Sequence, residues 1–343
     1  MRVLVPFGAR KMYEVGYVVN LKDHSEYKCK NIVRIIDRVF DEEKLELAKW
    51  ISEKYFCNLS EAIRLLVPPG TGTSVDKIKT KTEKHIYLKE DVNFETIKSE
   101  KQKKVIEFLR DNKSAPKIIL KELLDVSDAI LKTLEKNGYI EIKDVEVARN
   151  PFVNKEIKKT LPFELTKEQK DVIERIDING YDKYLIHGVT GSGKTEIYLQ
   201  LIDKVLKQGK NAIVLVPEIS LTPQITDRFL SRFGNVVAVL HSGLSLGERY
   251  DEWQKIKSDN CRIVIGARSA IFAPLKDIGI VIIDEEHDSS YKSETTPKYD
   301  AKEIANYIAF SRDIPLVFRI SYTRYKNILW SFRWKHKFIR IKK

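Results

Sequence analysis

Two short runs near the N-terminus, residues 2–7 and 15–19, are rich in β-branched and apolar residues and predict β-strands. Residues 43–55 follow with the spacing of an amphipathic helix. Its apolar stripe consists of Leu45, Leu47, Ala48 and Ile51. The Pro- and Gly-rich stretch 68–73 then predicts a linker. We therefore expect a small β-rich domain over residues 1–75.

The next segment has three helical patterns, ended by a glycine. They cover residues 102–110, 118–124 and 127–136, and Gly138 closes the third. Residues 139–142 and 145–147 predict a small hairpin. Three helices and a hairpin are typical of a winged-helix domain, which we place at residues 83–155. Such a domain either binds DNA or contacts proteins, and the fold does not decide between these roles.

From residue 161 onward, apolar runs alternate with helical patterns, which predicts a parallel α/β lobe over residues 161–318. Apolar runs at residues 184–187, 212–217 and 278–283 have the composition of strands buried on both faces of a sheet. The expected fold class is therefore α/β with several domains, one of them RecA-like.

The first of these strands leads into a phosphate-binding loop. Its residues are Gly188, Val189, Thr190, Gly191, Ser192, Gly193, Lys194 and Thr195. Glycines let backbone N–H groups converge on phosphate oxygens, and the helix that follows directs its positive end toward the phosphates. We expect Lys194 to reach the β- and γ-phosphates of ATP and the Thr195 hydroxyl to bind Mg²⁺. The alternative is a chance match in a Gly-rich turn.

An acidic box, Asp284-Glu285-Glu286-His287, follows the apolar run 278–283. The carboxyl ends of parallel strands are where open α/β sheets bind ligands. We expect Asp284 to hold Mg²⁺ and Glu285 to orient or deprotonate the attacking water. Carboxylates after a strand also serve as ordinary helix caps. The preceding P-loop favours the catalytic interpretation and predicts an ATP-driven motor.

Polar residues elsewhere in the lobe are candidates for base and DNA contacts. Gln169 precedes the P-loop strand, and its amide can both donate to and accept from adenine. Arg268 and Ser269 follow a strand, as do Ser220 and Thr222, where they suit contacts to phosphates of a single strand. Alternatively, the hydroxyls cap a helix and Arg268 pairs with an acid. Residues 288–299 either stack on a base or form a solvated loop.

Charge and cysteine content limit the alternatives. Nine Lys or Arg and no Asp or Glu fall in residues 319–343, so the formal charge of +12 falls to +3 over the preceding 318 residues. The basicity is concentrated in this tail, and the body must be assigned from its motifs. Cys29, Cys57 and Cys261 lack metal-ligand spacing. We expect a cytoplasmic protein, since the chain shows neither a signal peptide nor a membrane-spanning run.

The motifs GVTGSGKTEIYL, LVPEISLTPQ, HSGLS, GARSAIFAP and IIDEEHDSSYK together resemble the PriA family of primosomal DNA helicases, in superfamily 2. The resemblance extends to about residue 317. It implies ATP-dependent 3′→5′ unwinding at stalled forks, with forked and single-stranded DNA, helicase-loading proteins and single-stranded DNA-binding protein as partners, in bacteria. Gly8 and Lys30 match positions that line the family's pocket for a 3′ end.

Two departures from the family pattern matter. Met1 falls about thirty residues into the pattern, which leaves the 3′-end pocket incomplete and suggests an overlooked upstream start. After residue 317 the family pattern is Leu-Gly-Ser-Ala-Thr-Pro, whereas this chain has Phe318-Arg319-Ile320-Ser321-Tyr322-Thr323. Removing one U from permitted codons restores the family pattern, so we hypothesise a frameshift. The alternative is a genuine basic and aromatic DNA-binding tail.

The frameshift hypothesis has consequences for function. The chain would lack the second motor lobe with its arginine finger, and the cysteines that bind zinc in the full-length family. We then expect nucleotide and DNA binding without unwinding. The leading rival is a non-catalytic fork-binding module with a vestigial motor lobe. A translocase acting on RNA or duplex DNA is a second rival, and a small-molecule kinase explains neither the acidic box nor the flanking domains.

Overall fold

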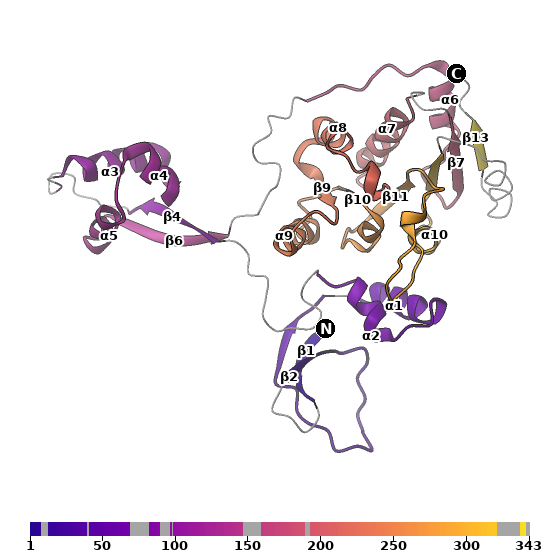
Figure 1. Cartoon of the computed structure of the whole chain (residues 1–343), viewed down its shortest axis with the longest axis horizontal. Helices are drawn as coiled ribbons and strands as arrows, with labels where there is room; N and C mark the ends of the chain where they lie inside the picture. The colour runs from indigo at the N-terminus through magenta and orange to yellow at the C-terminus, as the bar shows by residue number, and fades with distance from the viewer. Residues whose placement is uncertain are drawn as a thin grey trace. The chain divides into compact units, whose positions relative to one another are not determined.

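The computed structural model describes residues 1–7, 13–39, 41–68, 82–89, 97, 99–146, 159–188, 193–320 and 337–340. The chain forms two compact units, and Figure 1 traces both. One unit combines residues 1–78 with residues 151–343, and the other comprises residues 79–150. The P-loop and the acidic box both belong to the first unit.

A parallel sheet forms the centre of the first unit. Its strands are β7 (Lys183–His187), β8 (Asn211–Leu215), β9 (Val237–Leu240), β10 (Ile263–Gly266), β11 (Ile278–Ile283), β12 (Leu316–Ile320) and β13 (Lys337–Arg340). They lie in the order β13-β7-β12-β11-β8-β10-β9, and each neighbouring pair is parallel. The predicted parallel α/β lobe is confirmed. All six residues of β11 are buried, as its apolar sequence predicts.

Helix α6 (Lys167–Glu174) precedes β7, the first strand of this sheet in the chain. Further helices connect strands that follow one another in the chain: α7 (Lys194–Lys207), α8 (Pro223–Phe233), α9 (Leu246–Lys257) and α10 (Ala301–Ser311). Alternate strand residues enter different apolar clusters: Ile213 and Val281 pack with α10 residues, whereas Val214 and Ile282 pack with α7 residues. This two-residue period shows that both faces of the sheet are covered.

At the end of β10, the backbone of Leu240 lies close to Gly266. A Cβ added there would lie 2.3 Å from the Leu240 carbonyl oxygen and 2.8 Å from the Ala270 Cβ. The glycine in the GARSAIFAP motif is thus explained by packing between β10, β9 and the 3₁₀ turn Arg268–Phe272.

The N-terminal residues of this unit form a second, antiparallel sheet. It contains β1 (Arg2–Pro6), β2 (Tyr13–Tyr17) and β3 (Arg34–Asp37), in the order β2-β1-β3. The helices α1 (Glu42–Lys54) and α2 (Leu59–Leu65) follow, and the predicted amphipathic helix corresponds to α1. Ile51 and Ile63 share one apolar cluster with Ile304 of α10.

Polar contacts join α1 and its flanking residues to α10. The Tyr55 hydroxyl donates to Glu303 at 2.8 Å, and Arg312 forms two hydrogen bonds to Glu43 at 2.7 and 2.9 Å. Helices α1 and α2 are therefore packed on the parallel α/β lobe. The division into domains at residue 75 remains a prediction.

The second unit contains three helices and an antiparallel sheet. The helices α3 (Glu100–Asn112), α4 (Lys117–Leu124) and α5 (Asp128–Lys136) confirm the three predicted helices. The strands are β4 (Thr82–Leu88), β5 (Ser114–Pro116) and β6 (Ile140–Glu146), in the order β5-β4-β6.

The predicted hairpin over residues 139–147 is wrong, because residues 140–146 continue as the single strand β6. This strand pairs antiparallel with β4 along its whole length, from Ile140 opposite Leu88 to Glu146 opposite Thr82. The short polar interruption at Lys143 and Asp144 indicated a turn, but pairing with β4 keeps it extended.

None of the helices in the described part of the chain has the length and hydropathy needed to span a bilayer. The predicted linker at residues 68–73 lies, except for Pro68, outside the described residues.

Candidate nucleotide site

The strand β7 leads into the P-loop, and α7 leaves it. Gly188 follows β7, Gly193 caps α7 and Lys194 is the first residue of the helix. Gly193 has φ of 72°, and a Cβ there would lie 2.3 Å from Nε2 of Gln169. A left-handed residue pressed against a neighbouring side chain requires glycine. Val189, Thr190, Gly191 and Ser192 lie outside the described residues.

Lys194 is buried at the start of α7, and its ammonium donates to the Gly188 carbonyl across the loop. Burial lowers the pKa of Lys194 to about 8, and the positive charge of Arg319 contributes to the decrease. The carboxylates of Glu285 and Asp284 act in the opposite direction. Because β7 and β11 both run parallel to β12, the P-loop lysine and the acidic box lie at the same edge of the sheet and form one site.

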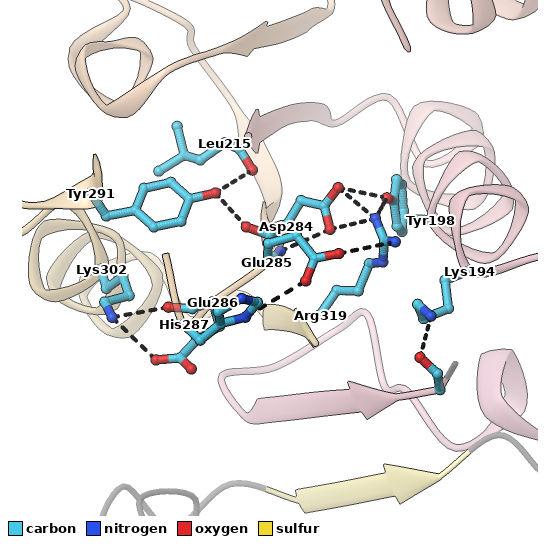
Figure 2. Close-up of polar contacts among 11 residues, drawn as sticks. Lys194, Tyr198, Leu215, Asp284, Glu285, Glu286, His287, Tyr291, Lys302 and Arg319 are labelled. Atoms are coloured by element: carbon cyan, nitrogen blue, oxygen red, sulfur yellow. Dashed lines mark hydrogen bonds and ion pairs between the residues drawn. The ribbon is translucent and has the colours of Figure 1, made fainter. Parts of the chain in front are cut away.

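Asp284 is almost completely buried at the carboxyl end of β11, and Arg319, Tyr198 and the main chain of Glu285 contact its carboxylate (Figure 2). One Arg319 nitrogen, Nη1, lies 2.6 Å from each Asp284 carboxylate oxygen. The Tyr198 hydroxyl donates to Oδ2 at 3.2 Å, and the Glu285 N–H donates to Oδ1 at 2.8 Å. Burial raises the pKa of Asp284, while the charge of Arg319 opposes that increase.

Glu285 follows in a left-handed backbone conformation, with φ of 44°. Its carboxylate lies 3.3 Å from Nη2 of Arg319 and 3.6 Å from Nδ1 of His287. Non-glycine residues with positive φ are uncommon and often occur at functional sites. Here the turn separates the side chain of Glu285 from that of Asp284, so that both carboxylates face Arg319 (Figure 2).

The remaining residues of the acidic box anchor the turn to its surroundings. Glu286 accepts from the Lys302 ammonium at 3.2 Å, and that ammonium also donates to the Glu286 carbonyl at 3.1 Å. The Tyr291 hydroxyl lies between the carbonyls of Leu215 and Asp284, 3.1 Å from the former. Tyr291 therefore ties the end of β8 to the acidic turn (Figure 2). It is a supporting residue that the sequence analysis placed in a loop.

The other residues predicted for ATP or DNA contacts lie as follows. Gln169 is buried, and its side-chain oxygen accepts from the Thr166 N–H at 2.9 Å in a helix-capping box. Arg268 donates to the carbonyls of Ser290 and Lys292, at 3.3 and 2.8 Å, and holds the turn after the acidic box. Ser269 and Lys30 are exposed. Gly8 lies outside the described residues.

Tyr198 and Arg319 also belong to this site, although neither was predicted from the sequence. Tyr198 lies four residues after Lys194, so one helical turn places both at the same end of α7. Arg319 lies on β12, between β11 and β7, which brings it beside Asp284. The sequence offered a weak signal for Arg319, because a charged residue in an otherwise apolar strand requires a partner.

The oxygen donors at this site fit Mg²⁺ in type. The carboxylates of Asp284 and Glu285 and the hydroxyl of Thr195 are hard ligands of the kind that Mg²⁺ prefers. The guanidinium of Arg319 between the two carboxylates shows that they attract a cation. Asp284 and Thr195 are therefore the residues that could hold the metal, while Lys194 could hold the phosphates.

Two family models match the chain. Residues 162–318 match the family described as type III restriction enzyme, res subunit. Residues 1–68 match a 3′ DNA-binding domain. The first match covers both the P-loop and the acidic box, and the second covers the sheet β2-β1-β3 with α1 and α2.

Curated relatives are similar over most of the chain. Replication restart protein PriA of Bacillus subtilis is 38% identical over 92% of this chain and 48% of its own length. The PriA protein of Treponema pallidum is 34% identical over 92% of this chain and 38% of its own length. That of Synechocystis is 48% identical over 56% of this chain. The chain thus spans about half or less of the length of these relatives.

The solved structures that match the chain include the following two. The UvsW helicase of bacteriophage T4 is 17% identical, with a TM-score of 0.40, over 62% of this chain and 77% of that one. RecG bound to a three-way DNA junction is 20% identical, with a TM-score of 0.41, over 54% of this chain and 26% of that one.

Proposed function

Because the chain belongs to the PriA family of replication restart proteins, we propose that it is the ATP-binding part of a 3′→5′ DNA helicase that acts at stalled forks. The observation that supports this proposal best is that β7, which leads to Lys194, and β11, which leads to Asp284 and Glu285, both pair in parallel with β12. A P-loop lysine and an acidic pair that follow the two strands on either side of β12 suit phosphoryl transfer.

The chain's own residues would divide the work at this site. Lys194 would donate to the phosphate oxygens in place of the Gly188 carbonyl, and Glu285 would orient the attacking water. Thr195 and Asp284 would hold Mg²⁺, which neutralises charge that develops on the phosphates. The P-loop residues 188–195 would cradle the phosphates, and Gln169 would contact the adenine.

We further propose that the N-terminal residues capture a DNA end. The match to a 3′ DNA-binding domain supports this role for residues 1–75. Gly8 and the exposed Lys30 would line that pocket, and residues 83–155 would bind either the fork or a partner protein. In the lobe at residues 161–318, the exposed Ser269 would contact the phosphates of a DNA strand. Arg268 would do the same after it releases the Lys292 carbonyl.

Membership of this family also supports proposals about the cellular location and the partners of the chain. The curated relatives come from bacteria, and we expect this chain in the bacterial cytoplasm, associated with the nucleoid. Helicase-loading proteins and single-stranded DNA-binding protein would be its partners in the primosome. The resemblance implies zinc in the full-length family, but the three cysteines of this chain form no cluster in the sequence that would bind it.

Capture of a 3′ end predicts that fork binding depends on the chemistry of that end. We expect the Lys30→Ala change to weaken binding to a fork with a free nascent 3′ hydroxyl by about tenfold, as for the loss of one charged hydrogen bond. Fluorescence anisotropy with labelled forks measures this effect. Lys28→Ala removes a neighbouring exposed lysine and is the matched control.

Two outcomes would count against parts of this proposal. Equal affinity of the wild type for forks with a free and a phosphorylated 3′ end would refute end capture. Fork affinity that ignores ATP and falls when residues 319–343 are removed would favour the alternative, a non-catalytic fork-binding module with a vestigial motor lobe. The contact between Arg319 and Asp284 is the observation that favours this alternative.

We also propose that residues 318–343 result from a shift of reading frame. The strand β12 includes Phe318, Arg319 and Ile320, so the shift would fall within a sheet strand. Sequencing the coding DNA across the codons for residues 317–324, and about 1.5 kilobases beyond, tests this idea. We expect one surplus U, whose removal restores Leu-Gly-Ser-Ala-Thr-Pro. A confirmed sequence without that surplus would establish a genuine basic tail.

A further inference from the structure

Arg319 lies where β12 passes between the P-loop strand and the acidic strand. Strand residues alternate between faces, and Val317 belongs to the apolar cluster on the α7 side. Phe318 and Ile320 belong to the cluster on the opposite side. Arg319 is therefore on the α7 side, where its guanidinium carbon lies 5.9 Å from the centre of the Tyr198 ring. The side chain is 13% exposed, so most of it is withdrawn from water.

The guanidinium contacts both carboxylates of the site and the Tyr198 hydroxyl. Nη1 lies 2.6 Å from both oxygens of Asp284 and 2.9 Å from the Tyr198 hydroxyl. Nη2 lies 3.3 Å from Oε1 of Glu285. A magnesium ion requires ligand oxygens at about 2.0–2.1 Å and brings two positive charges of its own. It cannot bind Asp284 while a buried guanidinium occupies both oxygens.

We propose that Arg319 is an internal competitor for the metal, which holds this chain in a state that does not bind magnesium at Asp284. The inference rests on the proposed nucleotide site, because it concerns the same carboxylates. Binding of the metal requires that Arg319 withdraw from Asp284. While Arg319 stays there, nucleotide binds without the metal, and its phosphates are held by Lys194 and the rest of the P-loop. The repaired reading frame would place glycine at position 319, which has no side chain to compete.

Manganese provides a paramagnetic substitute for magnesium and a readout other than turnover. We expect Arg319→Gly and Arg319→Ala to gain one Mn²⁺ site, bound at least about tenfold more tightly than by the wild type in titrations followed by electron paramagnetic resonance. Both variants should also melt at higher temperature when Mg²⁺ is added, because a ligand that binds only the folded state stabilises it. The wild type should show neither effect.

Arg312→Ala is the matched control, since Arg312 also binds a carboxylate with two hydrogen bonds but lies outside the site. This variant should behave like the wild type toward Mn²⁺. If the Arg319 variants fail to fold, a comparison of the wild type with Asp284→Asn decides. The proposal requires the same Mn²⁺ titration for these two proteins, because Arg319 already occupies the Asp284 carboxylate of the wild type.

Loss of a Mn²⁺ site on Asp284→Asn in the wild type would overturn the proposal, as would equal Mn²⁺ affinity of the wild type and a folded Arg319→Ala variant. A fluorescent ATP analogue, titrated in the presence of EDTA, separates this result from the fate of the nucleotide site. Binding of the analogue in EDTA supports the proposed ATP site, whether or not Arg319 competes with the metal. Failure of the wild type and both Arg319 variants to bind the analogue would instead refute the proposed ATP site.

Discussion

Replacing Lys194 with Ala should weaken binding of ATP to this chain by about 100-fold, close to 3 kcal/mol, because charged hydrogen bonds to phosphate are lost. Lys194 is buried beside the loop, and its contact with the Gly188 carbonyl holds the ammonium at the mouth of the loop. Its pKa of about 8 leaves most of the side chain protonated at pH 7, so the measurement belongs at or below that pH.

Titration with a fluorescent ATP analogue measures this loss. Lys207→Ala is the matched control, because Lys207 lies on the same helix and pairs with Asp203 at the surface. We expect the control to bind the analogue like the wild type. In a full-length version of the protein, Lys194→Ala should also abolish ATP turnover. Nucleotide affinity that survives the Lys194 change would remove the phosphate-binding role assigned to this residue.

The second large effect concerns stability, at a buried ion pair between α7 and α8. Arg232 lies 2.9 Å from Glu196, and their side chains are only 6% and 11% exposed. Glu196 also accepts from Gln200 at 2.9 Å and from the Phe163 N–H at 3.3 Å. We expect Arg232→Ala to lower the free energy of unfolding by about 3–5 kcal/mol, because it leaves the Glu196 carboxylate buried without its counter-charge.

Urea unfolding followed by circular dichroism gives this free energy. Arg175→Ala is the control, because Arg175 and Asp171 form a pair at 3.6 Å that is more than half exposed. Exposed pairs contribute about 0–1 kcal/mol. The double change Arg232→Met with Glu196→Gln should recover much of the loss, since it removes both buried charges. If Arg232→Ala and Arg175→Ala lowered the free energy of unfolding equally, burial of the Arg232–Glu196 pair would make no difference to stability.

The strands and helices with strong local patterns were predictable. The run 278–283 is apolar throughout and became the buried strand β11, and the P-loop sequence required a strand before it and a helix after it. The apolar stripe of α1 likewise corresponds to its buried face, Leu47, Ala48 and Ile51. In each case the information lies within one stretch of chain, where side-chain periodicity determines which residues are buried.

The failures concern pairing between distant segments. Residues 140–146 looked like a hairpin because their partner, β4, lies before the three helices of that unit. Arg319 looked like the start of a basic tail, and only its place on β12, between β11 and β7, brings it to Asp284. Ile51 and Ile63 share a core with Ile304, a contact between distant segments that the sequence did not indicate. Local periodicity contains no information about such neighbours.

The strand β13 has a consequence for the behaviour of shortened chains. It lies parallel to β7, with Ile339 buried opposite Ile186, and so covers the outer side of the strand that leads to the P-loop. An uncovered strand presents a row of unpaired backbone N–H and C=O groups, which invites pairing with another molecule. Any version of this polypeptide that stops before residue 337, or that has another sequence there, must shield Lys183–His187 by other means to avoid self-association.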